Sequence, residues 1–236
     1  MGVSPMSLLS RVAGVFFSPR ATYTAVAAYP RALGALALAM AIGVAVSGAF
    51  ASTEVGRDAT LDMTVRSVES FGVTISDEMY RAMETRITSN AVRDAVIAQV
   101  LFFPCVSAIV AGLLLGVFTA IMGGVATFKH VFALVAHSGL IISLSQLFVT
   151  PLYYARGTIS AAASLGVFLP FLDEMSFLAR LLGSIDLFLV WWLVNLAIGL
   201  GVLYKRRTQP VAIGLLALYV GIAVVVAAVL TAISGA

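Results

Sequence analysis

The chain has 236 residues, of which 61% are hydrophobic and only 11% charged, and its formal net charge is +3 at pH 7. Soluble domains are about half apolar and a quarter charged, so this composition argues against a water-soluble fold and favours one polytopic membrane domain. The basic residues are too scattered to follow a phosphate backbone, and we expect no nucleic-acid partner.

Residues 1–31 precede the first uncharged run. Two short helices are predicted here, because Ser18-Pro19 is typical of a helix start and Pro30 of a helix end. Arg11 and Arg20 lie at the edges of these helices. The apolar residues of the first helix recur at helical spacing: Leu8, Leu9, Val12 and Phe16. A cleavable signal peptide fits poorly, since Arg11 interrupts the first apolar stretch. The pattern predicts an amphipathic helix pair lying in the headgroup layer.

We expect this pair to anchor the chain at the cytoplasmic membrane surface. The residues assigned to this membrane-interface anchor are Arg11, Phe16, Arg20, Lys205, Arg206 and Arg207.

Five apolar stretches are long enough to cross a hydrocarbon core about 30 Å thick. They cover about residues 33–49, 95–128, 131–154, 181–204 and 211–233, and the fourth of them carries one charged residue, Asp186. The sequence does not alternate apolar and polar residues, which argues against a β-barrel. We therefore predict an all-α membrane helix bundle with five transmembrane helices, residues 32–236 forming the transmembrane domain.

Residues 52–94 form the one long polar region of the chain. In "TISDEMYRAMETRI" Ser76 is placed to cap a helix whose first turn carries acidic residues. The pattern predicts an extracytoplasmic insert of one or two amphipathic helices, and a solvated loop is the alternative.

Residues 157–172 are apolar but short, and Pro170 interrupts them. This segment is typical of an interfacial or re-entrant piece rather than a sixth span.

The predicted loops differ in charge. One set carries seven basic residues and no acid, and the other carries seven basic residues spread among ten acids. Lysine and arginine counts alone are equal, but Lys205, Arg206 and Arg207 fill one very short loop. We therefore expect a cytoplasmic N-terminus and, with five spans, an extracytoplasmic C-terminus.

Residues typical of catalytic and metal sites are few. We find no Cys/His cluster with metal spacing, no phosphate-binding glycine loop and no nucleophile elbow. We expect no enzyme activity, metal or cofactor. The single cysteine, Cys105, lies in an apolar run and is expected to be a buried, inert thiol.

Polar side chains inside the predicted spans are costly unless they have partners. Gln99, Gln146 and Asp186 are expected toward the outer side, and His137 and Asn195 nearer the cytoplasmic side. Each group would supply hydrogen bonds between helices.

Asp186 is the one acidic residue predicted within a span. Two interpretations stay open, an ion or proton relay and a structural acid near the outer interface. Trp191 and Trp192 lie mid-span, where they are expected to pack between helices or against a partner rather than bind a cofactor.

Three segments resemble the Yip1-domain family of membrane proteins. "FFSPRATYTAV" is similar to the segment that precedes the family's first span. "GGVATFKHVFALVAHSGLI" is similar to its Gly-Gly turn and following helix, and "LLGSIDLFLVWWLVNLAIGLGVLYK" to its fourth helix. The resemblance implies five spans and a cytoplasmic N-terminus. The long insert at 52–94 is larger than the resemblance leads us to expect.

The resemblance also implies a function in membrane organisation. Relatives in eukaryotes act with Rab GTPases and vesicle traffic, and some bacterial ones with export machinery such as ABC transporters. The high Ala, Val and Gly content and the use of Arg over Lys indicate a GC-rich prokaryote, so we expect a bacterial inner-membrane protein. We also expect lipid contact and either membrane-protein partners or a homo-oligomer. The alternative is a small-solute or ion transporter whose path uses Asp186, Gln146 and Gln99.

Overall fold

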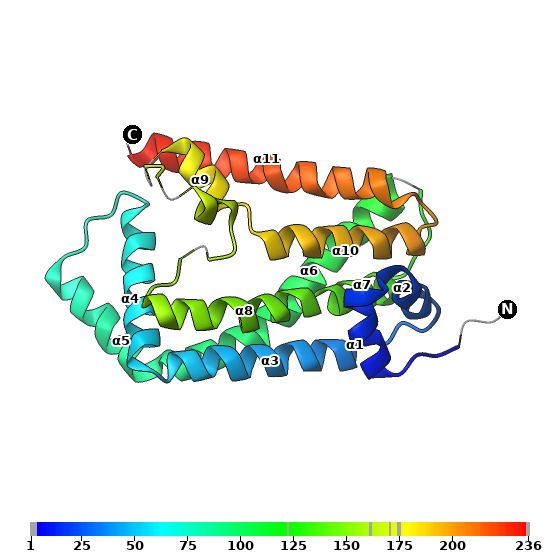
Figure 1. Cartoon of the computed structure of the whole chain (residues 1–236), viewed down its shortest axis with the longest axis horizontal. Helices are drawn as coiled ribbons and strands as arrows, with labels where there is room; N and C mark the ends of the chain where they lie inside the picture. The colour runs from blue at the N-terminus through cyan, green and yellow to red at the C-terminus, as the bar shows by residue number, and fades with distance from the viewer. Residues whose placement is uncertain (1–3, 122, 161, 170, 174–175, 235–236) are drawn as a thin grey trace. The chain divides into compact units, whose positions relative to one another are not determined.

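A computed structural model describes residues 4–121, 123–160, 162–169, 171–173 and 176–234 (Figure 1). Within these ranges the chain is helical, and its sole β pairing is an isolated bridge between Ser164 and Asp186. Pro170, which interrupts the short apolar segment of the sequence, lies outside the described residues. The expected all-α class is confirmed.

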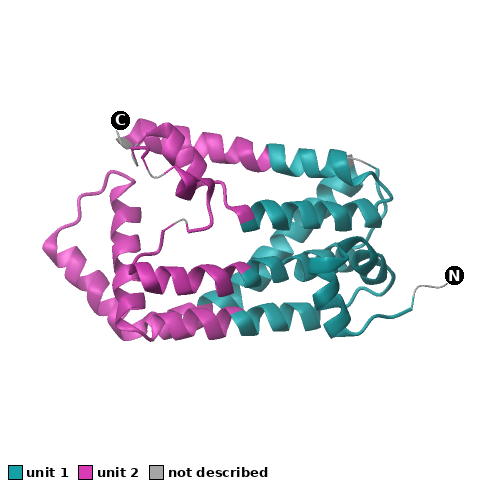
Figure 2. Ribbon diagram, in the orientation of Figure 1, with its two compact units in different colours: residues 1–42, 98–144, 188–217 teal, residues 43–97, 145–187, 218–236 magenta. Residues whose placement is uncertain are grey.

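The chain divides into two compact units (Figure 2). Unit 1 comprises residues 1–42, 98–144 and 188–217, and unit 2 comprises residues 43–97, 145–187 and 218–236. Each unit therefore collects segments that are far apart in the sequence.

Unit 1 begins with the short helices α1 (Leu8–Phe17) and α2 (Pro19–Ala28). It also contains the first part of α3 (Leu33–Ala51), α6 (Phe103–Leu115) between the π-helical turns η1 (Ala98–Phe102) and η2 (Gly116–Ile121), and α7 (Phe128–Ser138). The start of α8 (Leu140–Arg156), most of α10 (Leu187–Leu203) and the start of α11 (Thr208–Ser234) complete it.

The core of unit 1 is formed where α2, α6, α7 and α10 meet. Tyr23, Leu134, Leu196 and Leu200 are fully or almost fully buried there. A second cluster around Val15 and Ile141 joins α1 to α3 and α8. Burial of both short N-terminal helices against this core makes them part of the fold.

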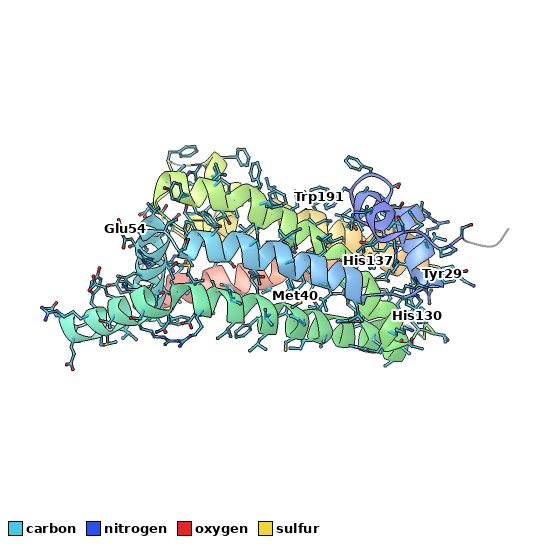
Figure 3. All side chains as sticks on the ribbon, turned by 90° about the horizontal axis from the view of Figure 1, so that it is seen from below. Tyr29, Met40, Glu54, His130, His137 and Trp191 are labelled. Atoms are coloured by element: carbon cyan, nitrogen blue, oxygen red, sulfur yellow. The ribbon has the colours of Figure 1, made fainter. Side chains whose placement is uncertain are left out.

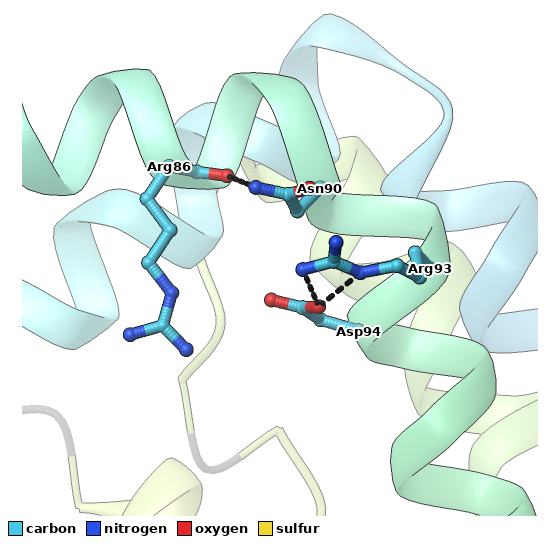
Figure 4. A network of polar contacts seen from close by, with 4 residues as sticks. All are labelled: Arg86, Asn90, Arg93 and Asp94. Atoms are coloured by element: carbon cyan, nitrogen blue, oxygen red, sulfur yellow. Dashed lines mark hydrogen bonds and ion pairs between the residues drawn. The ribbon is translucent and has the colours of Figure 1, made fainter.

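Unit 2 contains α4 (Glu54–Glu69), α5 (Asp77–Ile97), the 3₁₀ turn η3 (Leu165–Phe168) and α9 (Phe177–Gly183), with the remaining parts of α3, α8 and α11. At the start of α5 the Ser76 hydroxyl accepts a hydrogen bond from the Met79 N–H at 3.3 Å. Exposed polar contacts follow along α5 (Figure 4): Arg93 Nε and Nη2 donate to Asp94 Oδ1 at 3.1 and 3.0 Å. Exposed ion pairs of this kind contribute little stability.

Among the described residues, four helical stretches are long and apolar enough to cross a membrane: Leu33–Ala51, Asp77–Ala120, Phe128–Arg156 and Thr208–Ile233. The chain is thus an integral, multi-pass membrane protein. The fourth predicted span corresponds to α10, an apolar helix of 17 residues that falls just below the length of these four. Because the sequence between 181 and 186 forms part of α9 and a turn rather than of α10, the helix is shorter than its apolar run.

The long stretch Asp77–Ala120 joins the predicted polar insert and the second predicted span in one helical path. Pro104 explains one irregularity in it, because proline has no N–H to offer the carbonyl four residues earlier. The π turn η1 lies directly before this proline. Changes of helical period at such a position are common.

The expected burial of Cys105 is wrong: its side chain is exposed on α6. The physical reason is that lipid is as apolar as a protein interior, so an apolar run in a membrane helix does not imply burial against protein. Many large apolar side chains of α6 and α11 are likewise exposed, including Ile109, Leu113, Leu218 and Val225.

Candidate functional site

The two N-terminal helices of unit 1 turn sharply against each other at Ser18. Pro19 begins α2, and Ser18 has φ −148° and ψ 60°, outside the helical region. The helices approach so closely that a Cβ atom on Gly14 would lie 2.0 Å from Thr22 Oγ1. Only glycine fits at position 14 without moving Thr22, which is fully buried.

Pro19 leaves one backbone acceptor of α1 without its usual donor. The carbonyl of Val15 would ordinarily accept from the N–H of residue 19, and proline has none. Asn195 of α10 supplies the donor, because its Nδ2 lies 2.9 Å from the Val15 oxygen. A side chain 180 positions away therefore completes the end of α1.

The same amide binds the second short helix. Asn195 Oδ1 accepts a short hydrogen bond from the hydroxyl of Tyr23, and both residues are buried. Gly199, one turn further along α10, lets the tyrosine ring approach the helix closely, since a Cβ there would be 3.2 Å from Tyr23 Cδ1. Burial raises the pKa of the Tyr23 phenol, which keeps the hydroxyl protonated and able to donate.

Trp192 joins α10 to α7. Its indole Nε1 donates to Ser138 Oγ at 3.0 Å, and this hydroxyl donates in turn to the carbonyl of Val135 at 3.0 Å. Trp191 points to another neighbour: its ring lies edge-on to that of Phe16 on α1, with 5.9 Å between centroids. We call Val15, Tyr23, Ser138, Trp192 and Asn195 the polar junction.

His137 lies on α7 near this junction, and Figure 3 labels it together with His130 of the same helix. Its Nδ1 lies 2.7 Å from the carbonyl of Ala133 and must therefore carry the proton. Nε2 is buried and has no hydrogen-bond partner among the described residues. His130 is exposed and bonds Thr127 Oγ1 at 2.7 Å. Within the described ranges no group of three or more His, Cys, Asp or Glu could hold a metal ion.

The Gly123-Gly124 turn before α7 uses its glycines in two different ways. Gly123 has a φ of +67°, a conformation that favours glycine. Gly124 lies against the ring of Tyr204 from the end of α10, and a Cβ there would be 2.4 Å from Tyr204 Cδ1. The Tyr204 ring also stacks on Phe118 with centroids 5.0 Å apart. The turn thereby fixes α7 to the end of α10.

The family model of the Yip1 domain matches residues 13–230. The chain belongs to the Yip1 family. Comparisons with curated proteins and with solved structures found no match.

The three segments that resemble the Yip1 family meet at the polar junction and the glycine turn. Pro19 and Tyr23 come from the first segment, Gly124 and Ser138 from the second, and Asn195 from the third. All three segments thus contribute residues to the contacts that hold α1, α2, α7 and α10 together.

Of the polar residues predicted inside the spans, the structure gives Asn195 and Trp192 hydrogen bonds between helices. His137 instead bonds its own helix, and Trp191 only makes ring contacts. Sequence reasoning missed the partners Tyr23, Val15 and Ser138. The missing N–H of Pro19 was the available signal for Val15, since it marks an unpaired carbonyl.

The residues predicted toward the outer side of the membrane are divided between the two units. Gln99 is half-buried on η1 in unit 1, whereas Gln146 and Asp186 belong to unit 2. Gln146 Oε1 is buried without a hydrogen-bond partner among the described residues.

Asp186 lies in a turn whose backbone is fixed by hydrogen bonds to other residues. Tyr219 accepts from the Asp186 N–H at 2.9 Å and donates to the Ser184 carbonyl at 2.7 Å. The neighbouring backbone pairs with residues 163–165, through Leu165 N–H to Ile185 O and Leu187 N–H to Ala163 O, each at 2.9 Å. This turn explains why α10 begins only at Leu187.

The predicted anchor residues differ in exposure. Arg20, Lys205, Arg206 and Arg207 are exposed and Phe16 is half-buried. Arg11 is buried, and its Nε donates to the Met6 carbonyl at 3.2 Å. Burial and then the positive charge of Arg31 lower the pKa of the Arg11 guanidinium, which still stays protonated at neutral pH.

Proposed function

We propose that this Yip1-family chain is a non-enzymatic membrane protein that binds other membrane proteins, without a cofactor or nucleic acid. The observation that carries the proposal is the polar junction. Asn195 and Trp192 use their polar atoms on partners within the bundle. Side chains engaged in this way fix helices to one another, and their polar atoms are not free to bind a transported solute.

The surface supports the same proposal. Leu113 on α6 is 66% exposed and Leu218 on α11 is 62% exposed, among many other apolar side chains of these helices. Such surfaces face lipid or the spans of another protein. The partner is a membrane protein, such as an ABC-type export complex, or a second copy of this chain.

We propose five spans, in which α10 is the fourth along the chain and adds to the four longer helical stretches. Its 17 residues rise about 26 Å, which lies at the short end of the lengths that cross a bilayer. Residues 1–31 then form the interfacial anchor on one side, and the insert at 52–94 lies on the other.

Charge supports a cytoplasmic N-terminus in a bacterial inner membrane. All eleven acidic residues of the sequence fall in the segments of unit 2, while the segments of unit 1 carry seven of the fourteen basic ones. The loops free of acids include Lys205, Arg206 and Arg207 between α10 and α11. Dense basic loops beside spans stay in the cytoplasm.

Photo-crosslinking tests the binding proposal. A photoreactive amino acid is placed at Leu218 or Leu113 and, as a control on the same helix as Leu218, at the fully buried Ala227. We expect a crosslink to one membrane protein from the exposed positions and none from position 227. Recovery of the uncrosslinked monomer from all three positions would contradict the proposal.

Cysteine labelling tests the orientation. In a Cys105→Ser background, single cysteines replace Ser7 and Asp77, which are both exposed. A membrane-impermeant maleimide applied to intact cells should label position 77 and not position 7. Labelling of both positions from outside would overturn the proposed topology.

Flux measurements address transport. Liposomes containing the protein should be no more permeable to small ions than empty ones. Flux that depends on the protein and is lost in Asp186→Asn would favour a transporter over the proposed function.

A further inference from the structure

A cavity of about 360 Å³ lies within unit 1, between α6, the α7–α8 junction and α10. Its size is within the range of pockets that bind small molecules. Its walls are almost wholly apolar and include Phe103, Val106, Val110, Ile142 and Trp192. Val106 is 53% exposed, so this wall borders the apolar medium around the helices.

One polar group lines the cavity without being used. Ser107 is only 7% exposed and forms part of the wall. Its hydroxyl makes no hydrogen bond to any described residue. The indole N–H of Trp192, in contrast, is already bonded to Ser138. Ser107 is therefore the side chain of this wall whose hydroxyl is available for a hydrogen bond with a ligand.

Water is a poor occupant of such a space. A buried water molecule needs two to four polar partners, and the lining offers the single hydroxyl of Ser107. A hydrocarbon chain alone would fill the volume but leave the hydroxyl unpaired, which costs free energy in a buried place. A molecule that is mainly hydrocarbon and carries one oxygen satisfies both requirements.

The position of the cavity along the helices restricts the occupant further. Gly139 lies eleven residues after the start of α7, and Trp192 lies eleven residues before the end of α10. Both are therefore about 16 Å from those helix ends, which is close to the middle of a bilayer. A charged headgroup would not be stable at this depth.

We propose that this cavity binds a neutral, lipid-soluble molecule with a single carbonyl-type oxygen, which accepts a hydrogen bond from Ser107. The apolar body of the ligand contacts Val106, Val110 and Ile142. The site shares Trp192 with the polar junction, where the indole N–H is bonded to Ser138, and it does not depend on the partner-binding proposal.

Benzophenone is a suitable probe because it is neutral, has one carbonyl oxygen between two rings, and inserts into C–H bonds on irradiation. The full chain in nanodiscs is irradiated with increasing benzophenone, and adducts are located by peptide mass spectrometry. We expect saturable adducts on Val106, Val110 and Ile142. Diphenylmethane has the same two rings without the oxygen, so it should compete only weakly with benzophenone for the site in the wild-type protein.

Three variants separate the site from the lipid-facing surface. Ser107→Ala should raise the half-saturating benzophenone concentration about fivefold, the ratio supported by one ordinary hydrogen bond. Val110→Phe fills the cavity and should abolish the saturable adducts. Leu113→Phe on the outer face of the same helix should leave them unchanged. Each variant is first checked for a monodisperse elution profile and an unaltered thermal unfolding midpoint.

The proposal is overturned if labelling rises linearly with benzophenone concentration, or if Val110→Phe labels like the wild type. Equal half-saturation in Ser107→Ala and the wild type would remove the role of the hydroxyl. Saturable labelling that appears only after a bound protein is stripped away would mean that a partner's side chain occupies the cavity instead.

Discussion

The side-chain amide of Asn195 donates to the carbonyl of Val15 at 2.9 Å, in the position where residue 19 would donate if it were not proline. Two sequence features that look unrelated thus form one structural unit. Pro19 has no N–H to donate to the last turn of α1, and the side chain of Asn195 on α10 supplies the missing donor. Because Asn195 also binds Tyr23, one side chain holds both short helices.

Replacement of Asn195 by alanine should release the N-terminal helix pair. The change removes the donor to the Val15 carbonyl and the Asn195 acceptor of the Tyr23 hydroxyl, both in a buried place, and each such loss costs about 1–3 kcal/mol. We expect the free energy of unfolding in detergent to fall by about 2–4 kcal/mol. Trypsin should also cleave faster after the exposed Arg20 and Arg31.

Asn90→Ala is the matched control. Asn90 Nδ2 donates to the Arg86 carbonyl at 3.1 Å, but this bond is exposed on α5 (Figure 4). Exposed substitutions usually change stability by less than about 0.5 kcal/mol. If Asn195→Ala were as mild as Asn90→Ala, the polar junction would not be what holds α1 and α2.

Gly124→Ala should destabilise the connection between α7 and α10. The added Cβ would lie 2.4 Å from the Tyr204 ring, and overpacking of this kind costs about 1–3 kcal/mol. Gly112→Ala on α6 has open space and should be neutral or slightly stabilising. The thermal unfolding midpoints of both variants in the same detergent give the comparison.

A second substitution at Tyr204 checks the cause. In Gly124→Ala with Tyr204→Leu the ring is absent, so the double variant should lose less stability than the two single variants together. Simple additivity would show that the cost at position 124 does not arise from contact with Tyr204.

Trp192→Phe and Ser138→Ala should not be additive, because each removes one partner of the 3.0 Å hydrogen bond between α10 and α7. A double-mutant cycle should give a coupling of about 1 kcal/mol. Trp191→Phe with Ser138→Ala serves as the control pair and should show no coupling. Equal coupling in both pairs would contradict a specific bond to Trp192.

Stability should depend on the ionisation of Tyr23 in the alkaline range. Burial raises the pKa of this phenol above the value of about 10 found in unfolded chains. The unfolded chain therefore loses this proton first, so the stability that neutral Tyr23 contributes is complete below about pH 10 and declines as the pH rises further.

The comparison of wild type with Tyr23→Phe measures this effect. The wild type should be more stable than the variant by a constant amount between about pH 7 and 9, and by less above about pH 10. A larger tyrosinate absorbance near pH 10 in the folded wild type than in folded Tyr23→Phe would show that Tyr23 ionises normally.

The sequence predicts the helical class and the regions of the apolar helices well, because long uncharged runs have few other stable structures. It also places Asn195 and Trp192 inside the bundle. It does not identify Tyr23 and Ser138 as their partners, since those pairs are 172 and 54 positions apart and depend on how the helices pack.

Other misses have a local cause. The start of α10 depends on the turn that Tyr219 holds at Ser184 and Asp186, which no pattern in residues 181–204 reveals. The burial of Arg11 depends on the folding of the chain around it, where its guanidinium donates to the carbonyls of Met6 and Arg31. An isolated helix of the same sequence would place Arg11 at its polar edge.

The exposed thiol of Cys105 has a practical consequence. It is the one cysteine of the sequence and lies on α6, within an apolar helical stretch long enough to cross a membrane. A spin label or fluorophore attached to the unmodified protein will therefore occupy a single, known site. Its accessibility to oxygen or to brominated acyl chains will report directly on whether that side of α6 meets lipid or another polypeptide.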